Sequence, residues 1–81
     1  MLIIYGSDLC PDCIQCKADL EQANVAYEYR SITESLPHMK EFLAIRDKEA
    51  IYGNVKAAGK IGIPCIVDAD GGVHLEWKQY V

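Results

Sequence analysis

The pair Cys10 and Cys13, set between a short apolar run and a helical pattern, constrains the fold of this chain most. Residues 2–5 are β-branched, aromatic and too few for a helix, so they predict a strand. Residues 6–9 have the composition of a loop, and Pro11 suits the first position of a helix, where its missing N–H costs nothing. We therefore expect Cys10 at a helix N-terminus, where free N–H groups and the helix dipole favour a thiolate.

After this pair the chain alternates between helical and extended patterns. A helix is expected over residues 11–23, followed by an edge strand over residues 25–30 with alternating exposure. Two more helices follow, and residues 63–67 and 73–77 predict a hairpin because the turn residues 68–72 separate them. The residues expected to face the core from the three helices are Cys13, Cys16, Leu20 and Ala23, then Leu36, Met39, Phe42 and Leu43, then Ile51, Val55 and Ala58.

The order of elements predicts an α/β fold of the thioredoxin-like type in a single domain, residues 1–81. The first strand, helix and strand require a right-handed parallel crossover. The hairpin then joins the other side of the first strand, which gives a four-stranded mixed sheet in the order 2-1-3-4 with helices on its faces. Because only residues 78–81 follow the last expected strand, we expect no C-terminal helix.

Composition narrows the possible partners and location. The net charge is −4 and no basic cluster occurs, so we expect no nucleic-acid partner. No run approaches about 18 apolar residues, so we expect no membrane span. Four cysteines without a recognisable export signal indicate reduced or redox-active thiols, and hence a cytoplasmic protein.

A C-x-x-C pair at the first turn between strand and helix is typical of thioredoxin-like redox proteins. Together with residues 5–13, the step Gly62-Ile63-Pro64 makes the chain resemble the glutaredoxins, and more closely the small bacterial glutaredoxin-related proteins. This resemblance covers nearly the whole chain. It implies that Pro64 is cis and packs beside the cysteine pair, and that the backbone of Ile63 pairs with an extended substrate or with glutathione.

The resemblance also implies an activity, that of a thiol-disulfide oxidoreductase. Cys10 would attack a disulfide and Cys13 would resolve the mixed disulfide that forms. The expected partners are disulfide-containing proteins and, as electron donor, glutathione or a protein reductase. We expect no metal or resident cofactor, glutathione as a possible co-substrate, and a monomer or weak dimer. The candidate substrate-binding residues are Pro11, Asp12, Ile63 and Pro64, and Cys65 is a possible additional redox thiol.

Two departures from the glutaredoxin pattern predict weak glutathione binding. Glutaredoxins commonly carry a lysine shortly before the first cysteine, whereas residues 7–9 here are Ser-Asp-Leu. Their Gly-Gly pair opens a C-terminal helix that holds a glutathione carboxylate, whereas Gly71 and Gly72 here lie in the expected hairpin turn.

A second interpretation treats the cysteines as metal ligands. Cys10, Cys13 and Cys16 are spaced C-x-x-C-x-x-C, and the fold would bring Cys65 near the first pair, so four thiolates could hold zinc or an iron–sulfur cluster. Against this, Cys13 and Cys16 face inward along one helical stripe while Cys10 faces out at the helix tip. We therefore favour the redox interpretation.

Overall fold

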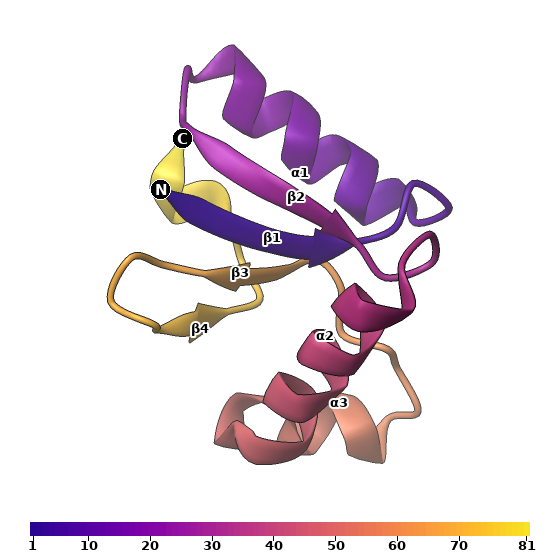
Figure 1. Ribbon diagram of the computed structural model, residues 1–81. Helices are drawn as coiled ribbons and strands as arrows, with labels where there is room; N and C mark the ends of the chain where they lie inside the picture. Colours follow the sequence, from indigo (N-terminus) through magenta and orange to yellow (C-terminus); the bar gives the residue numbers. More distant parts are fainter.

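A four-stranded sheet forms the centre of the computed structural model, which describes residues 1–81 (Figure 1). Its order is β2-β1-β3-β4, with β1 and β2 parallel and the other two pairs antiparallel, as the sequence predicts. The strands are β1 (Leu2–Gly6), β2 (Tyr27–Ser31), β3 (Cys65–Val67) and β4 (Val73–His74). The last strand is shorter than expected, because residues 75–77 leave the ladder.

Helix α1 (Pro11–Gln22) lies on one side of the sheet, and α2 (Leu36–Lys48) and α3 (Gly53–Ala57) lie on the other (Figure 1). The third helical region is divided: a single 3-10 turn, Ala50–Tyr52, precedes the short α3. A glycine at the junction disfavours one continuous helix. The chain ends in another 3-10 turn, Lys78–Tyr80, so the expected absence of a C-terminal helix is confirmed.

Local chemistry explains where the helices begin and end. Pro11 occupies the first turn of α1, and the side chain of Ser35 caps α2 by accepting a hydrogen bond from the backbone N–H of His38. Asn24 and Gly59, which follow α1 and α3, have positive φ angles of 58° and 73°. Both residue types adopt this left-handed conformation readily, so the helices stop there.

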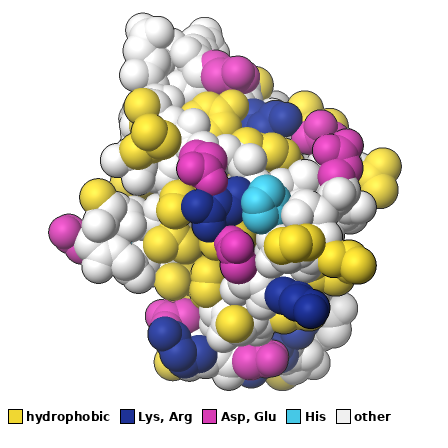
Figure 2. Space-filling view, in the orientation of Figure 1, with side chains coloured by type: hydrophobic (Ala, Val, Ile, Leu, Met, Phe, Trp, Pro, Cys, Tyr) yellow, Lys and Arg dark blue, Asp and Glu magenta, His cyan; other side chains and the backbone are white.

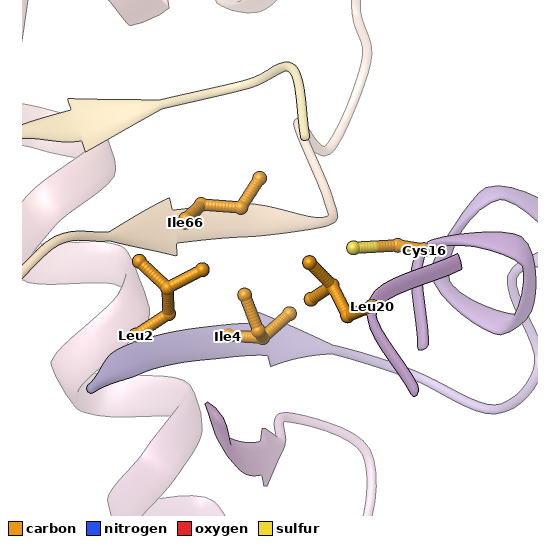
Figure 3. Packing of buried hydrophobic residues seen from close by; sticks show 5 residues of the cluster. All are labelled: Leu2, Ile4, Cys16, Leu20 and Ile66. Atoms are coloured by element: carbon orange, nitrogen blue, oxygen red, sulfur yellow. The ribbon is translucent and has the colours of Figure 1, made fainter. Parts of the chain in front are cut away.

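The face of the sheet under α1 is closed by α1 together with the C-terminal tail. Figure 3 shows side chains of α1 pointing toward those of β1 and β3; the buried cluster consists of Leu2, Ile4, Cys16, Leu20 and Ile66. Trp77 and Tyr80 of the tail pack against this cluster. The indole Nε1–H of Trp77 also donates a 2.8 Å hydrogen bond to Asp19 of α1, which fixes the tail in place.

The opposite face packs against α2 and the 3-10 turn before α3. Its buried cluster consists of Tyr5, Ile32, Phe42, Tyr52 and Cys65. Successive residues of a strand point to opposite faces, so Ile4 and Ile66 belong to the first cluster while Tyr5 and Cys65 belong to the second.

Several residues expected in the core are exposed instead. The buried side of α2 is centred on Phe42, and residue 43 lies roughly 100° around the helix from it. In the third helical region the 3-10 turn rotates Tyr52 into the core, where it is fully buried. The expected core residues that are exposed are Ala23, Leu36, Leu43, Ile51 and Ala58.

The surface mixes charges of both signs. On the face seen in Figure 2, acidic and basic side chains are intermixed, and apolar side chains lie between the charged groups. No helix is both long enough and apolar enough to cross a membrane.

Candidate active site

Cys10 occupies the N-cap position of α1. Its backbone is extended, with φ −104° and ψ 119°, and its carbonyl accepts the N–H groups of Cys13 at 3.1 Å and Ile14 at 3.2 Å. No side chain caps this helix, and the half-exposed thiol of Cys10 lies where a capping group normally does. The thiol therefore occupies the end of the helix that stabilises negative charge.

Cys13 lies in the first turn of α1 and is fully buried. Burial raises the pKa of its thiol to about 12, and the neighbouring Cys10 and Cys16 act in the same direction. The two thiols of the pair thus differ in access: Cys10 faces solvent, whereas Cys13 is protonated and enclosed.

A groove of about 420 Å³ opens beside Cys10. Its other wall is the segment of residues 59–63 together with Val55 of α3. The Ile63–Pro64 peptide bond is cis, as the resemblance implies, and Pro64 is buried. The structure therefore brings Cys10 and Ile63, from opposite ends of the chain, to the same groove.

The backbone of Ile63 is free to bind a partner. Neither its N–H nor its C=O makes a hydrogen bond within the chain. Only Pro64 separates it from β3, so an extended peptide in the groove can pair with these two groups as a strand pairs with a sheet edge.

Two residues that the sequence analysis missed hold the segment before Ile63. The guanidinium of Arg46 donates to the carbonyls of Ile61, at 2.8 Å from Nε, and of Lys60, at 2.6 Å from Nη2. The hydroxyl of Tyr52 donates to the carbonyl of Gly62 at 2.6 Å. All three carbonyls are thereby turned toward the α2 side.

Gly62 is the one signal in the sequence that could have pointed to this arrangement. Its φ is +89°, and a Cβ at this position would lie 2.2 Å from Cε1 of Tyr52. Only glycine permits both the left-handed backbone and the close approach of the tyrosine ring.

The groove is largely apolar with one cation. Lys60 is the charged residue that lines it, and exposed Ile61 lies on the same wall. Pro11 and Asp12 are exposed in the first turn of α1 beside Cys10 but do not line the groove. Leu9 and Ile14, which flank the pair, are exposed apolar residues as well.

The structure does not gather the four cysteines at one site, as the second interpretation expects, because Cys16 and Cys65 belong to different buried clusters. Cys16 packs between α1 and the sheet, whereas Cys65 is fully buried beside Tyr52 in the cluster on the opposite face. No three His, Cys, Asp or Glu side chains are grouped so that they could hold a metal ion. The strand period explains the separation, since Cys65 points away from the α1 face.

Comparison with solved structures defines the fold class. The chain is similar to the crystal structures of the thioredoxin-like protein BC3987 and of a mutant of that protein, with a TM-score of 0.68 and 22% identity in each case. Each alignment covers 99% of this chain, and 92% and 90% of the respective neighbours. The chain therefore has a thioredoxin-like fold.

Comparison of sequences defines the family. An uncharacterized protein of Haemophilus influenzae is 36% identical over 77 residues, which are 95% of this chain and 90% of that protein. The chain belongs to the same family as this protein. No protein-family model matches the sequence.

Proposed function

We propose that the protein is a thiol-disulfide oxidoreductase that works through the pair Cys10 and Cys13. One observation carries this proposal: a half-exposed thiol at the N-cap of α1 lies next to a fully buried thiol and opens onto a groove walled by Ile63. The thioredoxin-like fold is compatible with such chemistry. The proposed location is the cytoplasm, where a reducing environment keeps both thiols available.

In the first step, a substrate disulfide enters the groove and its extended backbone pairs with the free N–H and C=O of Ile63. The thiolate of Cys10 attacks one substrate sulfur, the substrate S–S bond breaks, and a mixed disulfide forms while the other substrate sulfur leaves as a thiolate.

In the second step, Cys13 releases its proton to solvent and its sulfur attacks the Cys10 sulfur. The mixed disulfide breaks, a Cys10–Cys13 disulfide forms, and the second substrate sulfur leaves and takes up a proton. The substrate has then gained two electrons from the pair. A protein reductase or glutathione must restore the dithiol, while Cys16 and Cys65 remain buried thiols.

We further propose protein disulfides as the main substrates, with weak glutathione binding. The groove offers one cation, Lys60, for the two carboxylates of glutathione, and Asp8 and Asp12 lie exposed on the α1 side of the approach. The tail has no helix whose N-terminus could hold the second carboxylate. Two missing charged contacts of roughly 1–3 kcal/mol each sum to roughly 2–6 kcal/mol, which corresponds to a loss of about thirtyfold or more in affinity.

The proposal is tested by comparing Cys10→Ser and Cys13→Ser for reduction of a disulfide-containing protein. Cys10→Ser should abolish both turnover and mixed-disulfide formation, whereas Cys13→Ser should accumulate the mixed disulfide. Cys16→Ala is the matched control, because it removes a buried thiol of the same helix and should keep the wild-type rate. Wild-type turnover by Cys10→Ser would refute the proposal.

Peptide mapping after mild oxidation tests the proposed pairing independently. The expected product is a Cys10–Cys13 disulfide with Cys16 and Cys65 free, since a two-residue gap at a helix start suits the short Cα separation of a disulfide. A product linked mainly through Cys16 or Cys65 would contradict it.

A further inference from the structure

Tyr29 of β2 carries a tyrosine hydroxyl that is buried and has no hydrogen-bond partner. Its ring packs against the cluster under α1, and the Nζ of Lys17 lies 4.1 Å from the ring centroid. Burial raises the pKa of this hydroxyl above its ordinary value, so it stays protonated and is available as a donor. A buried hydroxyl without a partner is uncommon in folded proteins and calls for an explanation.

The unpaired hydroxyl lies beside the buried thiol of the pair. A Cβ placed on Gly6 would meet the Oη of Tyr29 at 2.9 Å and the Sγ of Cys13 at 3.0 Å. Both atoms therefore border the same small space at the end of β1. Because residue 6 is glycine, no side chain separates them.

The charged and titratable groups around Cys13 come from three elements. Cys10 and Cys16 flank it on α1, and both act to keep it protonated. Tyr29 faces it from β2. The carboxylate of Asp8 lies near the Tyr29 hydroxyl and is the competing acceptor for its proton, and Asp8 is itself held by Lys17 of α1 in a 2.9 Å ion pair. The backbone N–H of Ser7 is the group that acts to lower the pKa of Cys13.

We propose that Tyr29 is a positioning residue that donates its O–H to the sulfur of Cys13 when Cys13 becomes a thiolate. This role rests on the proposed function and concerns its second step. Cys13 releases its proton to solvent, its sulfur attacks Cys10, the Cys10–substrate bond breaks, and the substrate thiolate takes up a proton. Tyr29 keeps its own proton throughout. In the thiol form Cys13 is a poor acceptor, which explains why the hydroxyl has no partner in the structure.

The test isolates the second step. Ellman's reagent forms a mixed disulfide with Cys10 and releases one thionitrobenzoate, and attack by Cys13 then releases a second. The rate of the second release is followed by stopped-flow absorbance across a pH series in wild type, Tyr29→Phe and Tyr27→Phe. Tyr27 is the matched control, since it packs on the same cluster from the same strand.

Tyr29→Phe should slow the second release about tenfold at neutral pH and move its pH midpoint upward by about one unit, since one unit of pKa is a tenfold change in thiolate. Tyr27→Phe should leave both unchanged. An unchanged profile in Tyr29→Phe, or an equal change in both variants, would overturn the role of Tyr29.

A second measurement does not depend on turnover. In a Cys10→Ser background, the pH midpoint for alkylation of Cys13 by iodoacetamide should rise when Tyr29→Phe is added and stay fixed when Tyr27→Phe is added. No rise would overturn the inference. If wild type releases no thionitrobenzoate at all while alkylation shifts as expected, the proposed function fails but the contact between Tyr29 and Cys13 stands.

Discussion

The two faces of the sheet each bury a tyrosine hydroxyl, and they treat it differently. On the α2 face, Tyr52 donates to the carbonyl of Gly62 and so fixes the segment that leads to Ile63. On the α1 face, Tyr29 has no partner and lies close to Cys13. On one face the tyrosine hydroxyl therefore fixes a backbone segment, whereas on the other face the hydroxyl is unpaired and lies beside the buried thiol of Cys13.

A glycine lies close to each of these two tyrosines. Gly62 allows the ring of Tyr52 to approach the backbone, and Gly6 leaves the space that Tyr29 and Cys13 share. Gly62 also has a positive φ, whereas Gly6 does not. Substitutions at these glycines test the space around each tyrosine, and substitutions at the tyrosines test the role of each hydroxyl group.

The largest effect is expected for Gly62→Ala. Its Cβ would lie 2.2 Å from a carbon of the Tyr52 ring, and the backbone has a φ of +89°. The left-handed backbone and the overlap together should lower the free energy of unfolding by roughly 2–5 kcal/mol, measured by urea denaturation. Gly59→Ala is the control, because it has a φ of +73° with nothing within 4 Å, and it should lose only roughly 1–2 kcal/mol. Equal losses would show that the Tyr52 contact is unimportant.

Gly6→Ala should have the next largest effect on stability. Its Cβ would press on the Tyr29 hydroxyl and the Cys13 sulfur, and overpacking of this kind typically costs roughly 1–3 kcal/mol. Chemical denaturation measures the loss, and the second thionitrobenzoate release should slow as well. Gly53→Ala, with nothing within 4 Å, should instead stabilise the protein by roughly 0.5–1 kcal/mol. Destabilisation by both variants would remove the argument for a shared space at Gly6.

The comparison of Tyr52→Phe with Tyr29→Phe should separate the two tyrosine hydroxyls, with changes in stability no larger than that of Gly6→Ala. Tyr52→Phe leaves the carbonyl of Gly62 without its partner, so unfolding free energy should fall by roughly 1–3 kcal/mol. Tyr29→Phe removes a buried hydroxyl that bonds to nothing, so stability should be unchanged or slightly higher. Thermal unfolding of both variants checks this, and a clear loss in Tyr29→Phe would mean that its hydroxyl is already bonded in the dithiol state.

The smallest effect is expected from alkaline pH. Burial raises the pKa of Cys13 to about 12 and that of Cys16 to about 11, whereas an unfolded chain ionises its thiols near about 8.5. Because the folded pKa is the higher one, these thiols contribute their full stability below the unfolded pKa and lose it as pH rises above that value. Each should reduce unfolding free energy by roughly 0.8 kcal/mol between pH 7 and pH 9. Cys16→Ala should reduce the loss of unfolding free energy between pH 7 and pH 9 by the contribution of one thiol. An unchanged pH dependence would contradict the raised pKa of Cys16.

The sequence predicts the order of helices and strands and the helix boundaries well, because these follow from local chemistry. Pro11, Ser35 and Gly59 set helix boundaries through backbone conformation and capping, and the strand patterns give the sheet order. The position of Cys10 at the start of α1 follows from the same rules.

The walls of the groove were not predictable in this way. Arg46 and Tyr52 act on carbonyls that are 10 to 15 residues further along the chain, through a rotation of α2 and the 3-10 turn that no pattern in the sequence specifies. The same rotation exposes Leu36 and Leu43, which the helical period places in the core. The unpaired state of Tyr29 depends on the absence of a side chain at Gly6, which is a property of tertiary packing.

The bond between Trp77 and Asp19 gives the protein an optical reporter of its own. Trp77 is the single tryptophan of the chain, and its indole connects the C-terminal tail to the last turn of α1 through Asp19. Its fluorescence emission should change when the tail detaches from α1, the helix at whose N-terminus the pair Cys10 and Cys13 lies. Intrinsic fluorescence can thus monitor whether the α1 layer is assembled in every variant named above, without an added label.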